Sequence, residues 1–274
     1  MENDRPATQA VNRRIALLID ADNVSHSKIA LMLAELSKYG TANIRRAYGD
    51  WGSTSLKGWK DKLHDFAIRP IQQFSYSTGK NATDIALVID AMELLYTQDL
   101  DAFCIASSDA DFTPLIMQLK ANGHEVYGFG ARKTPAPFVN ACTTFLYLES
   151  LDDPAEPESV PSEPPRQAPR TARTARPKAP AAKPPASDLA NDEALVTILR
   201  GAVDAAAWDD GWASMSAAGS AAKRQSSIDP RNYGVKNFPQ LFQAVGLFEI
   251  FRDEGGQSFV ADKHNTDRDP TPSR

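Results

Sequence analysis

The chain has 274 residues, of which 42% are hydrophobic and 24% charged, and this composition excludes a chain that is disordered or fibrous throughout. At about 150 residues per domain, the length corresponds to roughly two domains. The formal net charge of -5 argues against a strongly basic nucleic-acid-binding surface, unless positive charge is concentrated locally.

Targeting signals and cysteine usage give a first expectation about location. The polar N-terminus has no apolar segment typical of a secretory signal, and the apolar runs fall short of the roughly 20 residues that cross a bilayer. Cys104 and Cys142 lie in apolar segments and no Cys-x-x-Cys pair occurs, so we expect two buried, reduced thiols and no structural zinc site. These features predict a cytoplasmic protein.

Short β-branched or apolar runs alternate with amphipathic segments in the first half of the chain, which predicts alternating strands and helices. The predicted strands cover residues 15–20, 42–50, 67–74, 102–109, 124–130 and 144–149. The predicted helices cover residues 25–39, 56–66, 81–96, 112–122 and 138–142. Repeated β-α units of this kind predict an α/β fold with a parallel sheet and helices on both of its faces.

A proline-rich segment follows, with ten of the 19 prolines between Pro154 and Pro185. It contains almost no large apolar residues, so it predicts a disordered linker. Its second half is a basic arm, which suits either a solvated spacer or a non-specific contact with a polyanion. The basic residues of this arm are Arg166, Arg170, Arg173, Arg176, Lys178 and Lys183.

The last part of the chain predicts a smaller unit. Helical segments are expected at residues 194–203, 211–222 and 238–244, and a β-hairpin at residues 248–261. Three helices and a two-stranded wing indicate a winged helix-turn-helix. We therefore predict one domain over residues 12–150, a linker over 151–187, a second domain over 188–262 and a disordered tail over 263–274.

Acidic residues gather where predicted strands end. Asp20 and Asp22 come at the end of the first strand, and Asp84 lies near the start of a helix. Asp109 and Asp111 come shortly after the apolar run AFCIA at 102–106. Ligands bind beyond the carboxyl ends of the strands in an open α/β sheet, so we expect these acids to face one crevice. Each acid alone could cap a helix or favour its dipole. Together they would repel one another, and a bound cation would remove that penalty.

Oxygen ligands alone favour Mg²⁺ or Mn²⁺ over zinc. Such a cation can activate a water and stabilise charge on a phosphoryl oxygen, which supports metal-assisted phosphodiester hydrolysis. Asn23, Ser107 and Ser108 could orient a carboxylate or a water, although small residues after a strand are also common turn formers. The histidines show no metal-ligand spacing, and the Gly-x-Ser-x-Gly motif of serine hydrolases is absent.

Four motifs occur in a fixed order: IDADN at 19–23, GKNATDIALVIDA at 79–91, SSDADFTPL at 107–115 and GFGARKTPAPFVNAC at 128–142. In this order they resemble the NYN domain and, more narrowly, its bacterial LabA-like (DUF88) branch. The resemblance implies a PIN-like three-layer fold and a Mg²⁺- or Mn²⁺-dependent ribonuclease. It also implies a set of catalytic and metal-binding acids with supporting residues. The central catalytic and metal-binding acids are Asp20, Asp84 and Asp109, with Asp22 and Asp111 as further metal-binding acids and Asn23 in support. Asp90 matches another acid of the family but lies on a different helix face, and Ser108 stays a supporting candidate on its position after a strand.

RNA contacts are expected around this site. In the NYN interpretation, Arg132 and Lys133 lie at the rim and could hold the RNA backbone, although exposed charges in a turn are an equal alternative. Lys80, in the second motif, is a further candidate. Trp51 could stack an unpaired base, whereas Trp59 lies at helical spacing with apolar neighbours and is expected in the core.

Residues 190–262 resemble an OST-HTH (LOTUS) domain, a family that binds RNA or protein partners. The resemblance is carried by Gly211-Trp212, Tyr233-Gly234 and the apolar run from Leu241 to Phe248. Acidic residues dominate the front of this unit and basic residues its later part, so both partner types stay open. The later basic residues are Lys223, Arg224, Arg231 and Lys236.

The sequence thus predicts a divalent-metal-dependent ribonuclease that cuts single-stranded RNA and leaves a 3′-hydroxyl, with a C-terminal module that recruits RNA or a protein partner. The alternatives are a non-catalytic RNA-binding or regulatory scaffold on the same fold, and a Mg²⁺ phosphatase that acts on small substrates.

Overall fold

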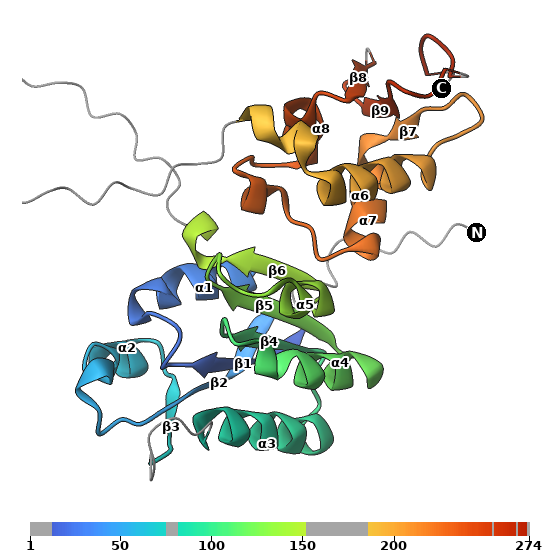
Figure 1. Cartoon of the computed structure of the whole chain (residues 1–274). Coiled ribbons are helices and arrows are strands. Elements are labelled where there is room, and N and C mark those ends of the chain that lie inside the picture. Colours follow the sequence, from blue (N-terminus) through green and yellow to red (C-terminus); the bar gives the residue numbers. More distant parts are fainter. Residues whose placement is uncertain (1–12, 75–81, 152–185, 254, 267, 273–274) are drawn as a thin grey trace, which may run out of the picture.

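The computed structural model describes residues 13–74, 82–151, 186–253, 255–266 and 268–272. Most of the predicted linker and the candidate Lys80 lie outside these residues. Figure 1 shows two domains, an α/β unit in blue to green and a smaller unit in yellow to red.

Six parallel strands form the sheet of the first domain. In chain order they are β1 (Arg14–Asp20), β2 (Thr41–Gly49), β3 (Arg69–Gln72), β4 (Ala102–Ala106), β5 (Glu125–Gly130) and β6 (Thr144–Tyr147). Their spatial order is β3-β2-β1-β4-β5-β6, and each neighbouring pair is parallel. The predicted parallel α/β sheet is therefore confirmed.

The α-helices described between these strands are α1 (Ile29–Leu36), α2 (Trp59–Asp65), α3 (Ala82–Thr97), α4 (Thr113–Ala121) and α5 (Ala136–Ala141). Side chains of β1 alternate between two cores, as period-two strand geometry requires. Ile15, Leu17 and Ile19 pack with α1 and α2 on one face, and Ala16 and Leu18 pack with α3, α4 and α5 on the other. This arrangement is the predicted three-layer architecture, and Figure 1 shows α3 and α4 on one side of the sheet and α1 on the opposite side.

Two of the predicted helices are shorter than expected, and each is preceded by a 3₁₀ turn with a serine cap. Ser25 accepts a hydrogen bond from the Ser27 amide ahead of η2 (His26–Lys28), and Ser53 accepts one from the Ser55 amide ahead of η3 (Thr54–Leu56). Serine side chains that satisfy nearby backbone amides favour such turns over a continuous helix. Two further 3₁₀ turns are η4 (Ala110–Phe112) and η5 (Leu148–Leu151).

The second domain has three α-helices and a three-stranded antiparallel sheet in the order β7-β9-β8. Its elements are η6 (Ala186–Asn191), α6 (Glu193–Asp204), β7 (Ala213–Ser214), α7 (Met215–Gln225), η7 (Pro230–Tyr233), α8 (Phe238–Val245), β8 (Phe248–Arg252) and β9 (Ser258–Asp262). The predicted three helices and wing are confirmed, and the two-residue strand β7 is an addition. The last residues of the predicted linker also begin η6.

The predicted disordered tail needs correction where the structure describes it. The Trp212 indole N–H donates to the Asp269 carbonyl at 2.9 Å, and the Asp269 amide donates to the Asp210 carbonyl at 2.9 Å. Arg268 pairs with Glu249 of β8 and lies over the Trp212 ring. Residues 268 and 269 therefore pack on the domain, where Asp269 supplies the acceptor that the buried Trp212 indole N–H needs.

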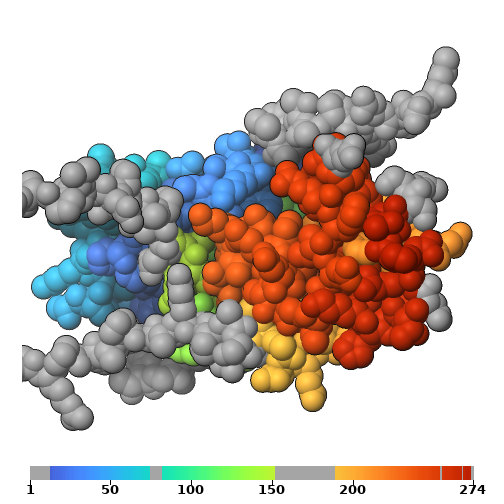
Figure 2. All heavy atoms as spheres, turned by 90° about the horizontal axis from the view of Figure 1, so that it is seen from above, coloured from blue at the N-terminus to red at the C-terminus, as the bar shows by residue number. Residues whose placement is uncertain are grey.

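The two domains contact each other through hydrogen bonds and an ion pair. In the view from above, the second domain (orange to red) lies over part of the first (Figure 2). Asn232 of η7 lies beside the edge strand β6, where its side-chain amide donates to the Phe145 carbonyl at 2.9 Å and its oxygen accepts from the Tyr147 amide at 3.2 Å. The Ser227 hydroxyl donates to the Val139 carbonyl of α5 at 2.6 Å. Asn232 thus pairs with β6 as a neighbouring strand would, and it covers an otherwise open sheet edge.

An ionic cluster adds to this domain contact. Arg231 donates to Glu35 of α1 at 2.5 Å and to Asp229 at 2.8 Å, and Lys38 donates to Glu35 at 2.6 Å. Glu35 and Asp229 are both buried, with 5% and 4% of their surface exposed. Two cations therefore neutralise a carboxylate that the contact removes from water.

Two smaller predictions concern cysteines and membranes. Cys104 and Cys142 are buried free thiols, as expected, and burial raises the pKa of each. In the described part of the chain, no helix combines the length and the hydropathy needed to cross a membrane.

Candidate active site at the carboxyl edge of the sheet

The strand order places two acidic segments next to each other. β1 lies between β2 and β4, so the connections from β1 and β4 leave the sheet in opposite directions, and a crevice forms at such a switch point. Asp20 is the last residue of β1, and the segment Ser107–Asp111 directly follows β4. The topology thus brings together residues that are far apart in the sequence.

Asp20 is the most buried acid of this edge, with 1% of its surface exposed. Its Oδ2 accepts hydrogen bonds from the Asn23 side-chain amide and from the Ser107 hydroxyl, both at 2.7 Å. Its Oδ1 is buried and has no hydrogen-bond partner among the described residues. A buried carboxylate oxygen is costly to leave unsatisfied, so this atom is a position where a cation would be stabilising.

Asp84, near the start of α3, shows the electrostatic effect of the grouped acids. Partial burial, followed by the negative charges of Asp20, Asp109, Asp111 and Asp22, raises the pKa of its carboxyl to about 6. The acids predicted from the sequence as one group therefore influence one another through space. Mutual repulsion of this kind is what a divalent cation would relieve.

Asp22 is a more exposed member of the group. Burial and then the charge of Asp20 raise its pKa, whereas a hydrogen bond of 3.3 Å from the Thr83 hydroxyl opposes the shift. Asp50 also raises the pKa of Asp22, although the sequence analysis did not select it. Asp50 directly follows β2 and accepts a hydrogen bond from Gln72 at 2.8 Å. Asp50 also lies at the carboxyl end of a strand, so the pattern that predicts the other acids applies to it as well.

Asp109 and Asp111 have partly structural roles. Asp109 caps η4 by accepting a hydrogen bond from the Asp111 amide at 2.9 Å, and its own amide donates to the Ser107 hydroxyl at 3.1 Å. One carboxylate oxygen of Asp109 therefore serves as a helix cap, as the capping alternative predicts. Within the described residues, no three acidic, histidine or cysteine side chains already stand at metal-ligand distances.

These residues nevertheless fit a divalent cation by their chemistry. The donors are oxygens, and the buried Asp20 Oδ1 has no partner among the described residues. The pKa of Asp84 is raised by burial and then by the negative charges of the neighbouring acids. Hard cations such as Mg²⁺ and Mn²⁺ prefer this donor set.

Asp90 lies outside the acid group. It accepts hydrogen bonds from Arg46 and from the Tyr48 hydroxyl, which both belong to β2. Asp90 thereby fixes α3 against the sheet, and α3 carries Asp84. Its contacts support a positioning role, in agreement with its expected location on a different helix face.

The remaining candidates are distributed along the same edge. The Trp51 indole donates to the Ile71 carbonyl at 3.0 Å and its ring lies edge-on to the buried Trp59, so packing occupies much of this side chain. Ser108 accepts a hydrogen bond from the Ala131 amide at 2.8 Å and connects the loop after β4 to the loop after β5. Ser107, rather than Ser108, contacts Asp20.

Arg132 and Lys133 follow β5 and are exposed. The Arg132 guanidinium lies 5.6 Å from the ring centroid of Tyr147, and the Arg132 amide donates to Glu149 at 3.1 Å. Arg132 is thus held at the end of β5, two strands away from Asp20.

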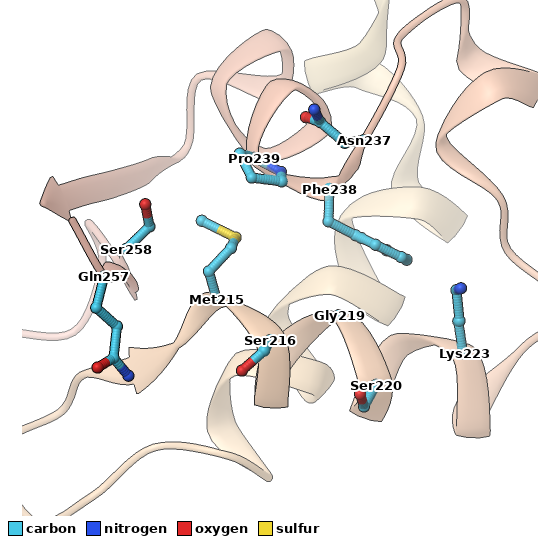
Figure 3. A pocket seen from close by; sticks show the side chains of 10 residues that line it. All are labelled: Met215, Ser216, Gly219, Ser220, Lys223, Asn237, Phe238, Pro239, Gln257 and Ser258. Carbon is cyan, nitrogen blue, oxygen red and sulfur yellow. The ribbon is translucent and has the colours of Figure 1, made fainter. Parts of the chain in front are cut away.

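The second domain has its own groove of about 500 Å³ between α7, the start of α8 and β9 (Figure 3). Lys223 lies 5.9 Å from the Phe238 ring centroid, and Figure 3 shows these two side chains near each other at one end of the groove. The rest of the lining combines polar groups with the apolar side chains of Met215 and Pro239; the polar residues are Ser216, Ser220, Asn237, Gln257 and Ser258. This surface offers one cation and several neutral hydrogen-bonding groups to a partner.

Comparison with known families assigns both domains. Residues 14–149 match the NYN domain, and residues 190–260 match the OST-HTH/LOTUS domain. The chain therefore belongs to the proteins that combine an NYN domain, with its PIN-like α/β fold, and a C-terminal OST-HTH/LOTUS domain.

Two individual proteins are similar to part of this chain. An uncharacterized protein of Methanocaldococcus jannaschii is 31% identical over 122 residues, which are 43% of this chain and 48% of that protein. The chain thus spans about half the length of this curated relative. A crystal structure of a protein of unknown function from Vibrio parahaemolyticus is similar with a TM-score of 0.42 and 17% identity, over 54% of this chain and 96% of that one.

Proposed function

We propose that this protein is a divalent-metal-dependent ribonuclease that hydrolyses single-stranded RNA. The observation that carries the proposal is the group of mutually repelling acids at the switch point of an NYN domain, with the pKa of Asp84 raised to about 6. The narrower relationship to the LabA-like branch is part of this proposal.

Asp20, Asp84 and Asp109 would hold Mg²⁺ or Mn²⁺, with Asp22 and Asp111 in support. When bound, such a cation lowers the pKa of water and stabilises negative charge on a phosphoryl oxygen. Hydrolysis of the bond between phosphorus and the 3′-oxygen would leave a 3′-hydroxyl on the RNA.

The surrounding residues prepare the site for this role. Asn23 and Ser107 fix the orientation of Asp20 by donating to its Oδ2, which keeps Oδ1 directed away from these donors. Below about pH 6 the Asp84 carboxyl holds a proton when no cation is present, and above that pH it is ionised. Arg132 and Lys133 would bind RNA phosphates at the rim.

The OST-HTH domain would recruit the substrate. Its attachment to the NYN domain raises the effective concentration of bound RNA at the nuclease site. The groove in Figure 3 is equally suited to a protein partner, which would deliver RNA indirectly.

Cleavage of labelled RNA by the full chain tests the proposal. With Mn²⁺ we expect cleavage by the natural protein and a loss of at least about 100-fold in Asp20→Asn and Asp109→Asn. Asp99→Asn is the matched control, because Asp99 is 97% exposed and pairs with Arg14 at the opposite edge of the sheet. Equal cleavage by Asp20→Asn and the natural protein would show that another site, or a contaminant, is responsible. RNA binding without cleavage would favour the non-catalytic scaffold, and turnover of nucleotides alone would favour a phosphatase.

A further inference from the structure

A cavity of about 510 Å³ lies where the two domains meet. The NYN domain contributes Arg132 from the loop after β5, Asn140 of α5 and Tyr147 at the end of β6. The OST-HTH domain contributes Ser226 and Tyr233, together with the start of α6. We call this cavity the interdomain cleft, because neither domain forms it alone.

The interdomain cleft lies on the same sheet edge as the acid group. Tyr147 ends β6, its register partner Gly130 ends β5, and Ser108 after β4 binds the Ala131 amide. With neighbouring strands about 4.8 Å apart, the edge runs continuously for about 15 Å from β1 to β6. A bound chain molecule could therefore follow this edge from Asp20 to the cleft.

The cleft offers aromatic and cationic groups together. Tyr147 and Tyr233 are both half-buried, and burial raises the pKa of Tyr147. Burial followed by the nearby charge of Asp192 raises the pKa of Tyr233 to about 12. Both phenols thus stay neutral at physiological pH. The exposed Arg132 guanidinium lies 5.6 Å from the Tyr147 ring centroid. Asp192 also lines the cleft, but its Oδ1 accepts from the Leu195 amide as the cap of α6.

Neutral aromatic rings beside a guanidinium are typical of sites that bind unpaired bases and the phosphates between them. We propose that the interdomain cleft binds unpaired nucleotides of an RNA strand that extends from the acid group along the sheet edge. Bases stack on Tyr147 and Tyr233, and Arg132 contacts a phosphate. A base paired in a duplex has no free face and no room in a cavity of this size. The cleft therefore selects single-stranded RNA.

The domain contact keeps the two walls together. Asn232, next to Tyr233 in sequence, hydrogen-bonds the Tyr147 amide, so the two tyrosines are joined through one short connection. Arg231 fixes the same turn to Glu35 of α1. The stacking surfaces are thus held in place before RNA binds, which reduces the entropic cost of binding.

The proposal takes its ligand class from the proposed ribonuclease, but its test needs no cleavage. We would measure the Kd of a short fluorescein-labelled oligouridine for the full chain in EDTA. Tyr147→Ala and Tyr233→Ala should each weaken binding about tenfold, as expected for one lost stacking contact. Tyr147→Phe and Tyr233→Phe should bind within about twofold of the natural protein, because the ring is retained. The control is Tyr96→Ala on the outer face of α3, where Tyr96 is 70% exposed.

Equal Kd values for the natural protein and both alanine variants would overturn the proposal, as would phenylalanine variants as weak as the alanine variants. Oligouridine containing 4-thiouridine gives a second readout. Photocrosslinks should map to the peptides that carry Tyr147 and Tyr233, and crosslinks confined to the Lys223–Phe238 groove would contradict it. If the protein binds oligouridine as predicted but does not cleave RNA, the ribonuclease proposal is wrong and the cleft proposal is supported. If it cleaves RNA but the tyrosine variants bind as the natural protein does, only the cleft proposal is wrong.

Discussion

The sheet edge and the domain contact each contain a buried carboxylate, Asp20 and Glu35 respectively, and the two carboxylates differ in their partners. Each accepts hydrogen bonds on one oxygen and has a second, buried oxygen without a partner among the described residues. Glu35, at the domain contact, receives Arg231 and Lys38, both of them cations. Asp20, at the sheet edge, accepts side-chain hydrogen bonds from the neutral Asn23 and Ser107, and the described part of the chain places no cation on it.

The pKa values report the same difference. Glu35 is desolvated, which would raise its pKa, but hydrogen bonds from Arg231 and Lys38 lower the pKa overall. At the sheet edge, burial and the other acids act in the same direction on Asp84 and raise its pKa to about 6. At the domain contact, cations neutralise the buried carboxylates and join the two domains. At the sheet edge, the acids lack such cations, as is typical of a ligand-binding site.

The largest effect should come from breaking the compensated region. Arg231→Ala leaves Glu35 and Asp229 buried without their shared cation, and we expect the free energy of unfolding to fall by about 3 kcal/mol. Thermal and urea unfolding would measure it, with the exposed Arg224→Ala on the same domain as control. Unchanged stability in Arg231→Ala would mean that the domain contact contributes little.

Removing the Asn232 side chain should cost less. Asn232→Ala removes two hydrogen bonds to β6 and leaves the Phe145 carbonyl and the Tyr147 amide unsatisfied, at about 2 kcal/mol. Hydrogen exchange at the Tyr147 amide should accelerate together with the loss of stability, whereas the exposed Asn43→Ala should change neither. Slow exchange in Asn232→Ala would show that another group covers this strand edge.

At the sheet edge, removing a charge should increase the free energy of unfolding. The pKa of Asp84 is raised from about 3.8 to about 6, so ionisation in the folded state weakens stability as the pH rises through this interval. Asp84→Asn should therefore stabilise the metal-free protein by about 1 kcal/mol at about pH 8, after allowance for solvent screening, and by nothing below about pH 3.8. Urea unfolding in EDTA at the two pH values measures this, and destabilisation at pH 8 would contradict it.

The smallest effect is an acid-side dependence of the domain contact. Since the pKa of Glu35 is lowered from 4.5, its contribution to stability is present above that value and is lost as the pH falls through the lowered pKa. Glu35→Gln should be less stable than the natural protein at neutral pH, and the difference should shrink on acidification. A difference that is independent of pH would assign the effect to packing.

Much of the fold was accessible from the sequence because its signals are local. Alternating apolar runs predict the strands, and acids at the strand ends predict the candidate edge without any knowledge of the sheet order. The 3₁₀ turns at Ser25 and Ser53 were missed because a serine cap competes with helix formation over only a few residues. The packing of residues 268 and 269 could not be predicted, because their contacts with Asp210, Trp212 and Glu249 join residues that are distant in the sequence.

The domain contact could not be predicted, because Arg231, Asn232 and Glu35 carry no local pattern that links them. The charges of the second domain suggested a partner surface, yet Arg231 is used within the chain. Asp50, in contrast, could have been predicted, because it is an acid at the carboxyl end of a strand like the other members of the group. The sequence predicts that Trp51 stacks on an unpaired base, whereas in the structure its indole N–H donates a hydrogen bond to the Ile71 carbonyl.

Mn²⁺ binding by the metal-free full chain tests the central claim, that the uncompensated acids at the sheet edge form a cation site. Calorimetric titration should show binding by the natural protein and by Asp99→Asn with the same Kd, and binding at least about tenfold weaker in Asp20→Asn. Equal binding by Asp20→Asn and the natural protein would contradict the account.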